Sequence, residues 1–297
     1  MSSLALAAVI VNVAIVFTGG LVRVTGSGLG CPDWPTCTGD RVVPSASDAT
    51  WHTAIEFGNR LMTFLVLAVV VWLFVAARRR SEDLRVRRLA LLLPLGVLAQ
   101  AVLGGVTVLT GLHPLIVAAH FLLSMVLIAI AVLLHLRVSA DRPVTGTAST
   151  TRVRVLALAT VTAAAAVLVL GTLVTASGPH AGDPGTVRLG LDIRTIARVH
   201  AGAVWAVTLL TAATYLVARR EQSSRVQRAA GVLLAVEVIQ GTVGYTQYAL
   251  DIPAALVAVH ILLASLFWVA AVRLVGIAVG WDISSGSGDR APARVGA

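Results

Sequence analysis

The chain has 297 residues, of which 57% are hydrophobic and only 12% are charged, and its formal net charge is +9. Soluble domains average about 25% charged residues, so this composition excludes a globular protein with a charged, water-facing surface. The net positive charge does not indicate nucleic-acid binding. In a membrane protein the positions of the arginines along the chain are more informative than their sum, because they set the orientation in the membrane. We therefore expect an integral membrane protein.

Eight segments are long and apolar enough to cross a bilayer as helices of about 20 residues. They cover residues 4–22, 53–76, 89–109, 116–136, 154–175, 196–218, 229–248 and 255–279. Arginines gather in the connections after the second, fourth and sixth segments, so the positive-inside rule predicts cytoplasmic termini. No small-residue cleavage pattern follows the first segment, which favours a retained helix over a signal peptide. Residues 281–297 are expected to form a disordered cytoplasmic tail.

The loop after the first segment, GSGLGCPDWPTC (26–37), holds both cysteines of the chain. The predicted topology places it on the extracellular side, where thiols tend to oxidise. Five residues separate Cys31 from Cys37, so a small closed loop is geometrically plausible. Two roles remain open, a structural staple and a redox or docking site. Zinc is disfavoured, because His52 alone does not complete a set of four ligands.

The two halves of the chain resemble each other. LAQAVLGGVTVLTGLHPLIVAAHFLLS (98–124) aligns with VIQGTVGYTQYALDIPAALVAVHILLAS (238–265), and TAIEFGNRL (53–61) aligns with RTIARVHAG (194–202). Each half has four segments, and an even number preserves orientation, so the repeat is parallel. We expect an all-α membrane fold of two pseudo-symmetric four-helix bundles. The predicted units are an N-terminal bundle (1–138), a cytoplasmic linker (139–153) and a C-terminal bundle (154–280).

Two histidines stand at matching depth in the predicted C-terminal bundle. His200 and His260 each lie roughly five residues, or about 7 Å, inside the outer ends of the sixth and eighth segments. These segments are diagonal partners in an up-down bundle, so the two imidazoles would face each other across the core. That arrangement suits axial ligation of one haem iron, whereas metals without a porphyrin usually need more ligands. The alternative is a pair of packing or hydrogen-bonding histidines.

The N-terminal bundle departs from this pattern. His120 aligns with His260, but Asn59 stands where the repeat predicts a partner histidine. His52, Glu56 and Asn59 follow at i, i+4 and i+7 and share one helical stripe. Glu56 and Arg60 are four residues apart and can pair, so the alternative to a reactive carboxylate is a paired or solvated charge. We expect this bundle to be the reactive one, with His120 leaving one face of the iron open.

The chain resembles the haem A synthase family through GGLVRVTGSGLGCPDWPTC, HTAIEFGNR and the repeated histidines of the fourth, sixth and eighth segments. The resemblance covers nearly the whole chain. It implies an eight-helix enzyme of the bacterial cell membrane that oxidises a ring methyl of haem O to the formyl group of haem A, for assembly of terminal oxidases. It also implies a disulfide between Cys31 and Cys37 and an important carboxylate at Glu56.

The family resemblance further implies haem b bound in the C-terminal half, haem O as the substrate in the N-terminal half, and oxygen or water as the oxygen source. The expected iron ligands are His200 and His260 for haem b and His120 for haem O. Many family members carry histidine where Asn59 stands, and His52 lies about 10 Å away along the helix. Possible partners are haem O synthase and oxidase assembly factors, besides membrane lipid and a second copy of the chain. The electron donor is unspecified.

Three arginines, Arg23, Arg60 and Arg198, lie near the outer ends of the first, second and sixth segments. They would suit haem propionates, because arginine forks match carboxylates, or they anchor the helices at the interface. A rival function is a non-catalytic di-haem protein that takes electrons from quinol. A transporter is weaker, because matching Gly/Pro-broken helices are not evident in the two halves.

Overall fold

The computed structural model describes residues 1–46, 50–139 and 149–281, and this part of the chain is helical without any strand. The eight helices are α1 (Ser2–Val24), α2 (Trp51–Arg80), α3 (Leu84–Leu109), α4 (Pro114–Val138), α5 (Thr151–Ser177), α6 (Ile193–Arg220), α7 (Ser224–Ala249) and α8 (Ala254–Ala278). The predicted tail from residue 282 and most of the predicted linker (140–148) lie outside the described residues.

Each of these helices is long and apolar enough to cross a membrane, so the predicted eight spans are confirmed. The protein is a multi-pass membrane protein. Most helices extend a few residues beyond the predicted spans, because polar turns continue them and hydropathy detects only the apolar centre. Side chains of Thr50, Asp83, Thr150 and Asp192 cap the first turns of α2, α3, α5 and α6.

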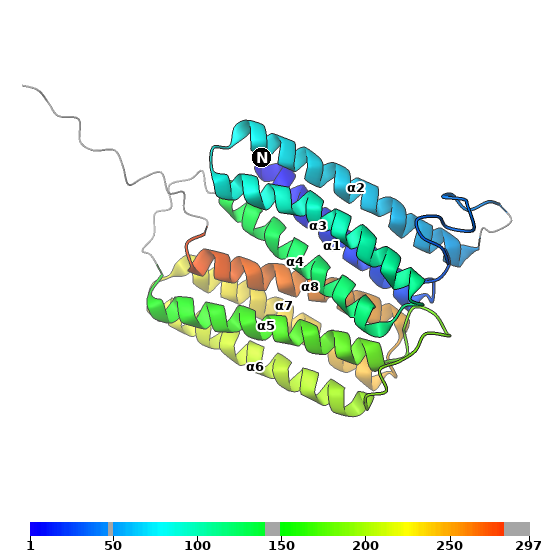
Figure 1. Ribbon diagram of the computed structural model, residues 1–297. Helices are drawn as coiled ribbons and strands as arrows, with labels where there is room; N and C mark the ends of the chain where they lie inside the picture. Colours follow the sequence, from blue (N-terminus) through cyan, green and yellow to red (C-terminus); the bar gives the residue numbers. More distant parts are fainter. Residues whose placement is uncertain (47–49, 140–148, 282–297) are drawn as a thin grey trace, which may run out of the picture.

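Consecutive helices run up and down in two groups, with α1 to α4 above α5 to α8 in Figure 1. In the first group the contacts close a ring from α1 through α2, α3 and α4 back to α1. In the second group they close a ring from α5 through α6, α7 and α8 back to α5. Helices α2 and α4 do not contact each other, and neither do α6 and α8, so each of these pairs is diagonal within its ring.

The two groups of helices pack against each other. Helix α8 contacts α1 and α4, and α4 also contacts α5. A Cβ added to Gly20 of α1 would lie 3.0 Å from the side chain of Ile261 in α8, so these two helices are in close packing. Leu134 of α4 and Leu274 of α8 are fully buried in the same apolar core.

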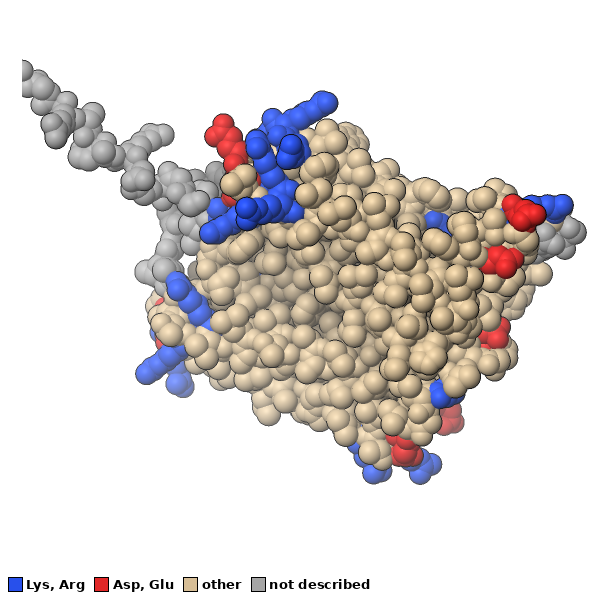
Figure 2. Space-filling view, in the orientation of Figure 1, with Lys and Arg blue, Asp and Glu red and all other residues tan. Residues whose placement is uncertain are grey.

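Charged side chains gather at the two ends of the molecule, with an almost uncharged band between them (Figure 2). One end carries the arginines that follow α2, α4 and α6, and we name it the arginine end. The opposite end carries the Cys31–Cys37 loop, and we name it the loop end. The uncharged band between them is the surface expected to face lipid.

Candidate haem sites at the loop end

The disulfide loop is held down on α2 by a network of charges and main-chain groups. Cys31 and Cys37 are bonded, as predicted, and both are fully buried. Glu56, whose side chain is 6% exposed, accepts a hydrogen bond from the main-chain nitrogen of Cys31 at 2.7 Å. Its other oxygen lies 2.7 Å from Nη2 of Arg60, which forms the ion pair expected from their spacing.

Arg60 connects the same carboxylate to the loop. Its guanidinium donates to the carbonyl oxygens of Cys31, Asp33 and Thr36 at 2.8 to 3.1 Å. Trp34 then packs across α3, where a Cβ added to Gly105 would lie only 2.4 Å from the indole ring. The loop therefore lies over the end of the first helix group and contacts two of its helices.

His52, Glu56 and Asn59 all face α1 or the segment that follows it. Nδ1 of His52 lies 3.1 Å from the hydroxyl of Ser27, and Asn59 accepts a hydrogen bond from the hydroxyl of Thr18 at 2.7 Å. The predicted stripe is therefore directed toward one neighbouring helix. Each of its members already has a polar partner there.

The other three candidate histidines share one environment. His120, His200 and His260 are half-buried, and in each ring Nδ1 is buried without a hydrogen-bond partner. Cε1 of each ring lies 3.2 to 3.3 Å from the position of a Cβ added to a glycine on the preceding helix. These glycines are Gly104, Gly171 and Gly244, respectively. Packing against a bare helix backbone therefore fixes each ring on one side.

Asn59 occupies the fourth position of this pattern. A Cβ added to Gly19 of α1 would lie 3.9 Å from the amide oxygen of Asn59, so a glycine of the preceding helix again faces the residue. Sequence reasoning on the single helices did not predict that a glycine lies against His120, His200, His260 and Asn59. The signal was available, because Gly19 aligns with Gly171 and Gly104 aligns with Gly244 in the repeat.

The amide side chains of the repeat also have matching partners. Gln100 donates to the carbonyl oxygen of His120 at 3.0 Å, and Gln240 donates to that of His260 at 3.1 Å. These bonds tie α3 to α4 and α7 to α8 at the level of the histidines. Since a helix carbonyl that accepts a second donor is held in place, the amides fix the backbone under each ring.

The diagonal placement of α6 and α8 brings His200 and His260 close enough to interact electrostatically. In the first ring the corresponding diagonal helices carry Asn59 and His120. Within the described residues, no group of three or more His, Cys, Asp or Glu side chains is placed to hold a metal ion. The geometry thus offers pairs of ligand-bearing positions and not a multidentate metal site.

Two further candidates behave differently. Arg23 reaches from α1 to the end of α5, where Nη2 donates to the carbonyl oxygen of Thr175 at 2.7 Å. Arg198 is exposed near the start of α6. A third residue, Glu237 of α7, is buried; its Oε1 accepts a hydrogen bond from Thr211 of α6 at 2.8 Å, whereas its Oε2 is buried without a hydrogen-bond partner.

Comparison with known proteins adds the family. Residues 2–182, more than half of the chain, match the COX15-CtaA family, described as cytochrome oxidase assembly protein. The chain is 35% identical over 137 residues to the heme A synthase of Listeria welshimeri serovar 6b, a match that covers 44% of this chain and 43% of that protein. It is 36% identical over 136 residues to the heme A synthase of Lysinibacillus sphaericus, covering 45% and 43% of the two chains.

These matches span less than half of the length of the curated relatives. The family match covers α1 to α5 and the start of the next connection, and it includes the disulfide loop, Glu56, Asn59 and His120. His200 and His260 lie beyond it. The length of the family match shows that the chain belongs to the COX15-CtaA family of cytochrome oxidase assembly proteins.

Proposed function

We propose that this chain is a haem A synthase, which oxidises a ring methyl of haem O to a formyl group. Family membership and the matches to heme A synthases support this activity. One observation carries it further, namely the asymmetry between two sites that are otherwise repeated. His200 and His260 lie on the two diagonal helices of one ring, whereas the corresponding diagonal helices of the other ring carry Asn59 and His120.

We infer that the two rings are pseudo-symmetric four-helix bundles and that the second holds haem b. The fit is favourable, because the two imidazoles stand on diagonal helices and a glycine of the preceding helix leaves room for each ring. His200 and His260 would hold the haem iron. When bound, haem supplies the redox and oxygen chemistry that side chains lack.

In the first bundle we assign His120 to the iron of the substrate, haem O. Asn59 is a poor iron ligand, so the opposite face would be open or held by His52 from nearer the loop end. Glu56 is the candidate catalytic residue, because a carboxylate there can hold water or move a proton, with oxygen or water as the oxygen source. Its ion pair with Arg60 fixes its position. A propionate on Arg60 would share the guanidinium with three loop carbonyls.

The proposed orientation places the arginine end in the cytoplasm and the disulfide loop outside the cell. Haem O synthase, as the source of substrate, and terminal oxidase assembly factors, as receivers of product, are the proposed partners. We also propose that the chain associates with a second copy of itself. The membrane is the medium in which these apolar porphyrins would be exchanged.

The test is to supply purified protein with haem O and an electron donor and to identify the extracted porphyrins. We expect haem A from the unchanged protein. Glu56→Gln keeps the shape but removes the charge, so it should retain haem b and accumulate haem O or a hydroxylated intermediate. Bound haem b with no haem A from the unchanged protein would instead support a quinol-oxidising electron carrier.

The haem ligands are tested separately by absorption spectroscopy. His200→Ala and His260→Ala should each remove or change the low-spin haem b spectrum. His113→Ala is the matched control, because His113 is exposed at the same end and caps α4 without a side-chain hydrogen bond. Unaltered spectra in both ligand variants would refute the assignment.

A further inference from the structure

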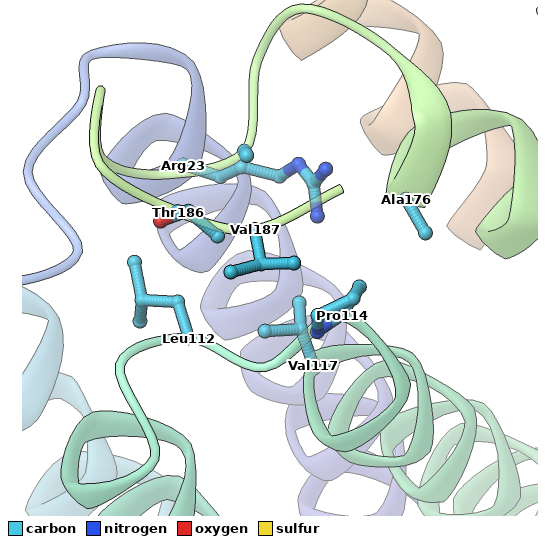
Figure 3. A pocket seen from close by; sticks show the side chains of 8 residues that line it. Arg23, Leu112, Pro114, Val117, Ala176, Thr186 and Val187 are labelled. Atoms are coloured by element: carbon cyan, nitrogen blue, oxygen red, sulfur yellow. The ribbon is translucent and has the colours of Figure 1, made fainter. Parts of the chain in front are cut away.

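A small cavity lies at the loop end, where the last turn of α1 meets the connection between α5 and α6. Arg23 lines it, together with Leu112, Pro114 and Thr186 among others. Figure 3 shows the Arg23 guanidinium extending over Val187 toward the end of α5. Nη2 of Arg23 donates to the carbonyl oxygen of Thr175 in α5, but Nε of Arg23 is buried and has no hydrogen-bond partner.

A second arginine stands beside the first. Arg188 donates through Nη2 to the carbonyl oxygen of Pro179 at 2.6 Å, while its Nη1 is buried without a partner. Its charge is close enough to interact with that of Arg23. The hydroxyl of Thr186, which lies in the same connection, is also buried and unpartnered. Arg23 and Thr186 thus each bring an unsatisfied polar atom to the cavity lining, and Arg188, which follows the lining residue Val187 in the chain, carries a third.

No carboxylate neutralises this pair. In the part of the chain that the structure describes, neither Arg23 nor Arg188 takes part in an ion pair. Two neighbouring like charges destabilise each other, and a buried donor without an acceptor is costly. An anionic group with acceptor oxygens would relieve both at once.

The connection that carries Arg188 is held in place from several sides. The main-chain nitrogen of Leu189 donates to the carbonyl of Ala176 at 3.2 Å, and that of Gly28 donates to the carbonyl of Gly182 at 2.8 Å. His180 bonds the carbonyl of Ile252 at 2.8 Å. The two guanidinium groups are therefore fixed in position before any ligand arrives, which lowers the entropic cost of binding.

We propose that Arg23, Arg188 and Thr186 form a binding site for one anionic oxygen group, a carboxylate or a phosphate. Guanidinium forks match both groups, and the hydroxyl supplies a third donor. The two sources with this chemistry are a lipid headgroup phosphate and a carboxylate of a bound porphyrin. A lipid phosphate at this site is independent of the proposed enzyme activity, whereas a porphyrin carboxylate there rests on the proposed haem binding.

Binding measurements on the purified protein separate these sources. Lipid-depleted protein is titrated with phosphatidylglycerol and, for comparison, with uncharged diacylglycerol. Haem-depleted protein is titrated with haem b and with its dimethyl ester, which lacks the carboxylate charges. We expect Arg23→Gln and Arg188→Gln to weaken binding of one anionic ligand at least tenfold and to leave its uncharged analogue unaffected.

Arg194→Gln is the matched control, because it removes the same charge from an exposed position near the start of α6. It should bind all ligands as the unchanged protein does. Thr186→Val keeps both arginines and is expected to weaken the same ligand about threefold, so it carries the test if the arginine variants fail to fold. Unchanged affinity for both anionic ligands in every folded variant would overturn the proposal and leave the cavity as a water site.

Discussion

Replacing Arg60 by glutamine should release the disulfide loop from α2. The guanidinium lies 2.7 Å from a carboxylate oxygen of Glu56 and also donates to the carbonyls of Cys31, Asp33 and Thr36. In the variant, Glu56 keeps the main-chain nitrogen of Cys31 as its neighbour but loses its counter-charge. A nearly buried carboxylate would then remain without a cation.

The magnitude follows from burial. Removing one partner of a buried ion pair costs about 3–5 kcal/mol, and the lower end applies because the Arg60 side chain is 22% exposed and water can reach it. Glu56→Gln is milder, about 1 kcal/mol, because the guanidinium keeps its three carbonyl acceptors. The double variant should lose less than the sum of the two, since the orphaned charge is then absent.

Thermal unfolding in detergent measures this cycle. At about 2–4 °C for each kcal/mol, Arg60→Gln should lower Tm by about 6–12 °C. Arg137→Gln is the matched control at the arginine end. The Arg137 side chain is 8% exposed, but the carboxylate that it would leave behind, Asp83, is 31% exposed, so water can solvate that charge and the loss should be nearer about 1 kcal/mol. If Arg60→Gln melts no lower than Arg137→Gln, the ion pair does not hold the loop.

Three further predictions concern the loop and the arginine end. In Gly105→Ala the new Cβ would lie 2.4 Å from the indole of Trp34, so the ring should be displaced at a cost of about 1–3 kcal/mol. Gly58→Ala is the control, because nothing lies within 4 Å of its new Cβ. Tryptophan fluorescence and Tm should distinguish the two variants. Replacing both Cys31 and Cys37 by serine should cost about 2 kcal/mol from loop-closure entropy, and equal Tm values would contradict it. Burial tends to raise the pKa of Asp83, but its hydrogen bonds and the nearby arginine hold that pKa below its ordinary value. The carboxylate therefore stabilises the fold above its ordinary pKa and loses this effect as pH falls through the lowered one, so the Tm difference from Asp83→Asn should vanish in acid and be full at neutral pH.

The number and type of helices were predictable from the sequence, because lipid leaves the backbone few options other than a helix about 20 residues long. The ends of the helices were harder to predict from the sequence. Helix α3 begins at Leu84, five residues before the predicted span, because Asp83 caps its first turn and arginines continue it. Hydropathy does not register such a polar turn.

At the candidate sites the sequence predicted the residues but not all their contacts. Spacing predicted the pair of Glu56 with Arg60, because one helix turn separates them. It did not predict that Arg60 binds three carbonyls of the loop, since loop geometry has no periodic signal. The contact between Gly104 and His120 depends on how α3 and α4 pack, which spacing within one helix does not reveal.

The contacts of α8 bear on how the chain is made. The ribosome delivers this helix last, yet it packs against α1, α4, α5 and α7. Until it enters the bilayer, Gly20 of α1 has no Ile261 to pack against, and His200 has no diagonal partner. A nascent chain that stops after α7 therefore leaves four earlier helices without a shared neighbour. Premature termination should send the product to membrane proteases as a whole rather than leave a stable N-terminal half.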